Sequence, residues 1–89
     1  MSDETMVRGR VMRLPMFDGL LPDHGPVHLV SDAGDELLLI AGPSSTPGKV
    51  EDLAAADAAN FEPYLDRDVE VSGQVYGSVI WSAAVVDPN

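Results

Sequence analysis

The sequence predicts a mainly β fold in which five short strands wrap into a small barrel, with one α-helix between the third and fourth strands. Stretches with a two-residue apolar alternation recur along the chain, turns rich in glycine and proline separate them, and a single segment carries helical spacing. At 89 residues the chain is long enough for one hydrophobic core and too short for two. Closure into a barrel is expected because it removes the exposed edges of an open sheet.

The first strand is expected over residues 6–14. One side of it holds Val7, Gly9 and Val11, and the other holds Arg8, Arg10 and Met12. Because Arg13 and Leu14 break this alternation and Gly9 lies mid-strand, we expect a bulge as the strand bends around the barrel. Residues 15–26 are rich in proline and glycine, which predicts a long irregular loop of the kind that often carries function.

Residues 27–31 and 36–41 flank a short turn, Asp32-Ala33-Gly34-Asp35, and together they predict a β-hairpin. The second arm contains an unbroken apolar run, Leu37-Leu38-Leu39-Ile40. We therefore expect both sides of this arm to be covered.

The helix is expected to begin at Thr46, as N-cap, with Pro47 at the first helical position. Apolar residues then follow helical spacing, interrupted by Asp57: Val50, Leu53, Ala54, Ala58 and Phe61. Asn60 is expected to stop the helix in the left-handed conformation, and Glu62-Pro63 to exclude further helix.

The clearest strand signal covers residues 69–76, where Val69, Val71, Gly73 and Val75 alternate with polar residues. Gly77-Ser78 turns the chain into a last strand, residues 79–86, rich in β-branched residues. Simple alternation places Val79, Trp81, Ala83 and Val85 on one side of this strand.

The resulting order of strands, loop, hairpin, helix and final hairpin is that of the OB-fold. Three segments carry this likeness: Val7-Arg8-Gly9-Arg10-Val11, Asp32-Ala33-Gly34-Asp35-Glu36-Leu37, and residues 61–73, which end in Val69-Glu70-Val71-Ser72-Gly73. The chain resembles small single-domain bacterial OB-fold proteins of uncharacterised function. We expect a single OB-like domain over residues 6–87, after a disordered acidic tail, residues 1–5. In such relatives the aromatic residue of the last strand often precedes a glycine, whereas Ser82 follows Trp81 here.

The chain carries 15 acidic and 5 basic residues, a net charge of −10, which disfavours contact with nucleic acid or an anionic membrane. The bias toward aspartate is typical of halophilic adaptation, but a GC-rich genome produces the same bias, and both interpretations stay open. The absence of cysteine excludes disulfides, thiolate metal sites and cysteine nucleophiles. The acidic start and the lack of an apolar stretch of about 18 residues predict a cytoplasmic protein.

OB-folds typically bind ligands on the face of the second and third strands, between the loop joining strands one and two and the loop joining strands four and five. Aromatic or histidine rings there could stack on a ligand, and arginines of the first strand could meet phosphates. Trp81 is interpreted either as a buried barrel residue or as an exposed binding residue. The candidate ligand-binding residues are Arg8, Arg10, Phe17, His28, Tyr76 and Trp81.

Catalytic and metal sites are not predicted. His24 and His28, with Asp23, lack a fourth ligand and share no helix. The segment before Lys49 ends in Gly-Lys as a phosphate-binding loop does, but its spacing is one residue too long and Val50 stands where such loops need Ser or Thr. No nucleophile with an adjacent base is evident. We therefore expect no cofactor and no enzymatic activity.

The sequence favours a non-enzymatic binding or interaction module whose partner is a protein or a small ligand. The first alternative is a single-stranded nucleic-acid-binding domain. The second is an acidic surface that imitates a nucleic-acid backbone and occupies a basic protein.

Overall fold

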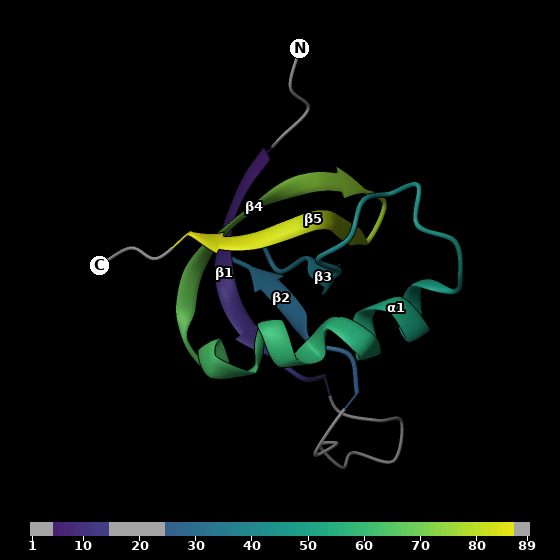
Figure 1. Ribbon diagram of the computed structural model, residues 1–89. Helices are drawn as coiled ribbons and strands as arrows, with labels where there is room; N and C mark the ends of the chain where they lie inside the picture. Colours follow the sequence, from purple (N-terminus) through teal and green to yellow (C-terminus); the bar gives the residue numbers. More distant parts are fainter. Residues whose placement is uncertain (1–4, 15–24, 87–89) are drawn as a thin grey trace.

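A computed structural model describes residues 5–14 and 25–86 of the chain (Figure 1). It confirms a mainly β fold with five strands and one α-helix between the third and fourth strands. The strands are β1 (Thr5–Met12), β2 (His28–Ser31), β3 (Glu36–Leu39), β4 (Asp68–Tyr76) and β5 (Val79–Val86). The helix is α1 (Val50–Asp57), and two short 3-10 turns follow it, η1 (Ala58–Asn60) and η2 (Glu62–Tyr64).

The five strands form one sheet in the order β1-β2-β3-β5-β4, and this sheet closes into a barrel because β1 pairs with both β2 and β4. All neighbouring strands are antiparallel except β3 and β5, which pair in parallel through Leu38 with Val79 and Leu39 with Ile80. Each strand therefore has a partner on both sides over at least part of its length.

The barrel closes at Gly9, which faces Ser31 of β2 and Val69 of β4 in the same register. A Cβ atom built on Gly9 would lie 2.2 Å from the carbonyl oxygen of Val30, so only glycine allows β2 to approach this closely. The bulge expected in β1 is absent from the described residues, since the register of β1 is continuous with both neighbours. Gly9 permits close packing here and does not mark an extra residue.

Two apolar clusters pack against the sheet, one on its inner side and one on its outer side. The barrel interior contains residues such as Leu29, Leu39 and Val71, and Ala58 and Phe61 of the segment after α1 belong to the same cluster. The second cluster lies between α1 and the outer side of β3 and β5, and its buried members are Leu38, Ile40, Ala54 and Trp81. The expectation for the apolar run in β3 is confirmed, because alternate residues of that run enter the two clusters.

The structure contains a bulge in β5, where Ser72 pairs with Ala84 but Gln74 pairs with Trp81. The extra residue lies next to Ser82, whose φ of 53° is in the left-handed region. Because of this shift, Ile80 lies inside the barrel before the bulge, and Ala83 does so after it. The uninterrupted alternation expected for this strand is therefore wrong, and Trp81 points to the side covered by α1.

The helix begins later than the sequence predicts. Thr46 is not the N-cap: its N–H donates to the Pro43 carbonyl oxygen in a turn, Gly48 has a φ of 124°, and Lys49 is extended. A backbone with that φ at Gly48 cannot continue a right-handed helix from Pro47. The first helical residue is therefore Val50.

The helix also ends differently. Asn60 does not adopt the left-handed conformation, because Ala58 to Asn60 continue as η1. The α-helix is over before Glu62-Pro63, as expected, and Pro63 lies in the first turn of the separate 3-10 turn η2. The Arg13 guanidinium, with a side chain only 9% exposed, pairs with the Glu62 carboxylate and ties the end of β1 to η2.

Among the described residues, no helix is both long enough and apolar enough to span a bilayer.

Candidate functional site

Arg8 and Arg10 lie on the outer side of β1, as the sequence predicts, but acidic residues of β4 stand beside both. Arg10 pairs with Asp68 through two contacts, Nε to Oδ1 at 3.3 Å and an η-nitrogen to Oδ2 at 3.4 Å. This hydrogen bond is the main reason that the pKa of Asp68 is lowered and that of Arg10 is raised. Arg8 faces Glu70 across the same strand pair. The two arginines therefore form no unopposed basic stripe.

His28 lies on the outer side of β2, between Met12 of β1 and Leu38 of β3. Its ring lines a shallow pocket of about 320 Å³ that also includes Glu36, Val50 and Glu51. Its Nδ1 atom is buried and has no hydrogen-bond partner among the described residues. Burial lowers the pKa of His28, while the nearby Glu36 carboxylate acts in the opposite direction. The neutral imidazole is therefore favoured, and this face offers little positive charge to a phosphate.

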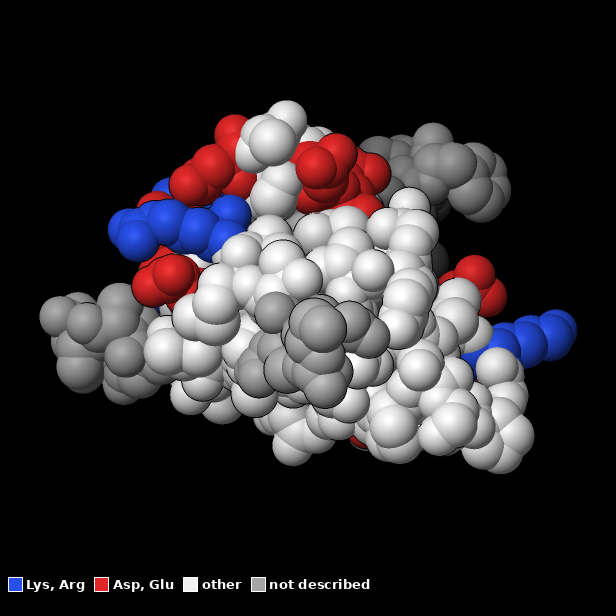
Figure 2. All heavy atoms as spheres, turned by 90° about the horizontal axis from the view of Figure 1, so that it is seen from above, with Lys and Arg blue, Asp and Glu red and all other residues white. Residues whose placement is uncertain are grey.

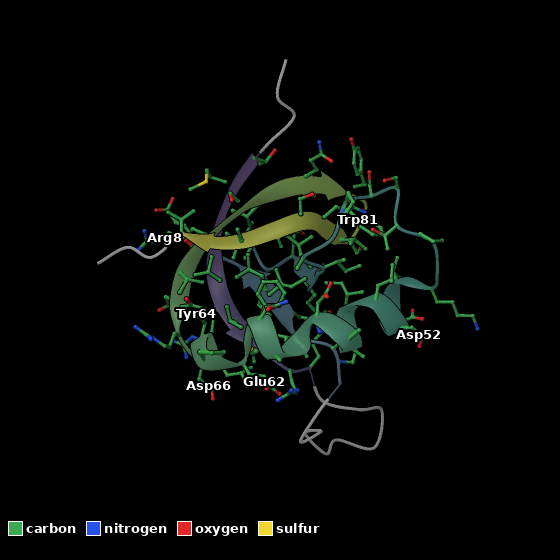
Figure 3. The ribbon with its side chains drawn as sticks, in the orientation of Figure 1. Arg8, Asp52, Glu62, Tyr64, Asp66 and Trp81 are labelled. Atoms are coloured by element: carbon green, nitrogen blue, oxygen red, sulfur yellow. The ribbon has the colours of Figure 1, made fainter. Side chains whose placement is uncertain are left out.

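Of the predicted aromatic residues, the two that the structure describes, Tyr76 and Trp81, do not gather around His28. Trp81 is 9% exposed and lies beneath α1, so the interpretation of this residue as buried is the one that the structure supports. Figure 3 shows Trp81 and Arg8 near opposite ends of β5. Tyr76 is 51% exposed at the end of β4, and Phe17 lies outside the described residues.

A second concave region, of about 620 Å³, lies at the end of the barrel where β1 begins. Its floor includes Val7, Leu37 and Val75, and its rim includes Arg8 and three acidic residues of the β2–β3 hairpin: Asp32, Asp35 and Glu36. One cation against three acids makes this opening unfavourable for an anion.

Within the described residues, no three His, Asp or Glu side chains come together as a group that could hold a metal ion. His24 and Asp23, which the sequence places near His28, lie outside that part of the chain.

The surface feature that stands out is an uncharged face over β4, β5 and the start of β1. Figure 2 looks down on it, and where the described residues are visible there, the charged side chains lie at its edges. The exposed large apolar residues of the described chain belong to it: Met6 at 50%, Tyr76 at 51% and Val86 at 39%. We define this uncharged face by Met6, Ser72, Gln74, Tyr76, Ser82, Ala84 and Val86.

The sequence contains a signal for this face that strand periodicity does not reveal. Residues 37–48 and 71–86 hold none of the 15 acidic and 5 basic residues of the chain. The two stretches lie side by side, since Ile40 donates to Ile80 and Ser82 donates to Gly42 through backbone hydrogen bonds of 3.1 Å and 2.7 Å. Part of this combined region is covered by α1. In the rest, Tyr76 of β4 and Ser82, Ala84 and Val86 of β5 are exposed, whereas Ser72 is buried and Gln74 is half-buried.

Comparisons with family models, with curated proteins and with solved structures gave no match to this chain.

Proposed function

We propose that this chain is an OB-type barrel that works in the cytoplasm as a non-enzymatic protein-interaction module, and that its partner binds the uncharged face. The strand order β1-β2-β3-β5-β4, with a helix between β3 and β4, supports the OB assignment. The observation that carries the functional proposal is the uncharged face itself, on a chain with a net charge of −10.

The chemistry of this face suits a protein surface. Exposed Met and Tyr side chains are enriched where proteins meet, and charged residues are depleted from the centre of such contacts. Met6 lies in line with Ser72 and Ala84 across three paired strands, so the face is continuous across the barrel wall. Its uncharged centre spares a partner the cost of desolvating ions.

Binding of single-stranded nucleic acid has less support. It needs cations that are free to meet phosphates and rings that are free to stack. Arg10 is paired with Asp68, the pKa of His28 is lowered, and Trp81 is buried. An NMR titration with single-stranded oligonucleotides at low salt checks this alternative, and shifts at Arg8, Arg10 and His28 would revive it.

Site-specific crosslinking in living cells tests the proposal. A photoreactive benzophenone amino acid replaces Ala84 in one variant and Ala55 in a control, and both positions are exposed. Ala84 lies at the centre of the uncharged face, whereas Ala55 lies on α1. We expect a protein adduct from position 84 and at least tenfold less from position 55. Equal adducts from both positions, or none from position 84, would overturn the proposal.

A further inference from the structure

The charge distribution indicates what kind of partner the uncharged face receives. Most acids of the described chain lie on α1, on the segment after α1 and on the β2–β3 hairpin, while Glu70 of β4 lies at the margin of the face, opposite Val86 and Arg8. Keeping acids off a contact surface matters most when the partner is itself strongly acidic, because like charges brought together cost free energy. A basic partner would be attracted by the acidic surfaces instead.

We propose that the occupant of the uncharged face is a second copy of this chain, which makes the protein a homodimer; this inference rests on the proposed function and names its partner. Two copies each carry a net charge of −10, so their approach is unfavourable through most orientations. The uncharged face is where the opposed surfaces bring the fewest like charges together.

The shape of the uncharged face is suited to a two-fold symmetric contact, in which the same patch of one copy meets that patch of the other. Its centre is formed by small side chains, and the Ser72 hydroxyl already donates to the Ala84 carbonyl oxygen at 3.4 Å. Larger side chains stand around this centre: Met6, Tyr76 and Val86. In an antiparallel arrangement, the large side chains of one copy lie over the small centre of the other.

The closed barrel also limits how the copies can meet. β4 pairs with β1 from Asp68 to Gly73, and β5 pairs with β3 at Val79 and Ile80, so these parts of the two strands offer no free edge for strand addition. The contact proposed here is made by side chains, face against face, as in the packing of two sheets. By symmetry, a charged residue introduced at the centre of such a contact buries two charges in the dimer, one from each copy.

Sedimentation velocity over a concentration series tests this inference with two matched variants. Ala84→Glu adds a carboxylate to the centre of the face, and Ala55→Glu adds the same group on α1. We expect the wild type and Ala55→Glu to sediment as dimers at high concentration, and Ala84→Glu to need at least tenfold more protein to associate. Added NaCl should tighten the wild-type dimer, because salt screens repulsion between two acidic copies. Tyr76→Ser, which adds no charge, should weaken it as well.

The outcomes separate this inference from the proposed function. A wild type that stays monomeric at millimolar concentration, or equal association of the two glutamate variants, overturns the homodimer. If position 84 then still crosslinks to a different protein, the proposed function survives without it. If position 84 crosslinks only within its own chain, both proposals fail. Far-ultraviolet circular dichroism and the emission of Trp81 verify that each variant is folded.

Discussion

At Ser82 the backbone of β5 passes through the left-handed region, with a φ of 53°. This conformation costs a residue with a Cβ atom about 1–2 kcal/mol, whereas glycine adopts it freely. Ser82→Gly should therefore raise the free energy of unfolding by up to about 1 kcal/mol, after the loss from the greater flexibility of glycine in the unfolded chain. Urea unfolding followed by circular dichroism measures this change.

Ala84→Gly is the matched control in the same strand, because Ala84 is also exposed and does not have a positive φ. There glycine brings only added flexibility, and the free energy of unfolding should fall by about 0.5–1 kcal/mol. If the two substitutions change stability in the same direction, the bulge at Ser82 is not strained as described.

His28 should make the fold sensitive to mild acid. Burial lowers its pKa below the ordinary histidine value of about 6.5, so between that value and its folded pKa the unfolded chain binds more protons than the folded chain does. The free energy of unfolding should therefore fall as the pH falls below about 6.5, and this fall should end below the folded pKa. His28→Gln should have a flatter dependence between pH 7.5 and 5.5.

The comparison of the two proteins isolates His28, because the other histidine, His24, is present in both. Glu36 opposes the effect through its charge, so Glu36→Gln should steepen the wild-type dependence. Parallel stability curves for the wild type and His28→Gln would show that the ring takes up its proton as easily in the folded chain as in the unfolded one.

At the scale of elements, Asp57 connects α1 to the end of β3. Its Oδ2 atom accepts a hydrogen bond of 2.9 Å from the backbone N–H of Ala41. Asp57→Ala should lower the free energy of unfolding by about 1 kcal/mol, while Asp57→Asn, which keeps an acceptor oxygen, should lose less. Asp52→Ala, on the exposed first turn, is the control and should change stability by a few tenths of a kcal/mol. If Asp57→Ala and Asp57→Asn lower the free energy of unfolding equally, the hydrogen bond to Ala41 is not the cause of the loss.

Strands and their turns follow from the sequence because alternation and turn residues are local. The β2–β3 hairpin is an example: Gly34, with a φ of 94°, and hydrogen bonds between Ser31 and Asp35 close the expected turn. Helix ends are less predictable, because Thr46 and Asn60 have suitable side chains but the backbone at Gly48 and the packing of Phe61 decide where α1 begins and ends.

The candidate site was less predictable than the fold, for a physical reason that Trp81 illustrates. The face of β5 on which the Trp81 side chain lies depends on the bulge next to Ser82. A serine in the sequence does not predict a left-handed backbone conformation, whereas a glycine there would suggest one. Arg10 shows the same limit, since Asp68 lies 58 residues away along the chain and meets it only through the β1–β4 pairing. The two charge-free stretches were visible in the sequence, but their adjacency depends on the parallel pairing of β3 with β5.

For the whole molecule, repulsion among acids opposes folding. The 15 acids outnumber the 5 basic residues, and the described chain holds two ion pairs, Arg10 with Asp68 and Arg13 with Glu62. Most acids among the described residues therefore form no ion pair, and bringing them together in a barrel costs free energy that the extended chain avoids. Salt reduces this cost, because the screening length falls from about 10 Å at 0.1 M to about 3 Å at 1 M.

The thermal unfolding midpoint should therefore rise by several degrees between 0.05 and 0.5 M NaCl, which corresponds to roughly 1 kcal/mol for a domain of this size. Removing two exposed acids of the β2–β3 hairpin, with Asp32→Asn and Asp35→Asn, should raise the midpoint at low salt and reduce its response to salt. The measurement is made with the Ala84→Glu variant as well, since salt that acts only through association would leave a monomeric form unchanged. A midpoint that is independent of salt in all three proteins would mean that the acids are already far enough apart in the folded barrel for water alone to screen them.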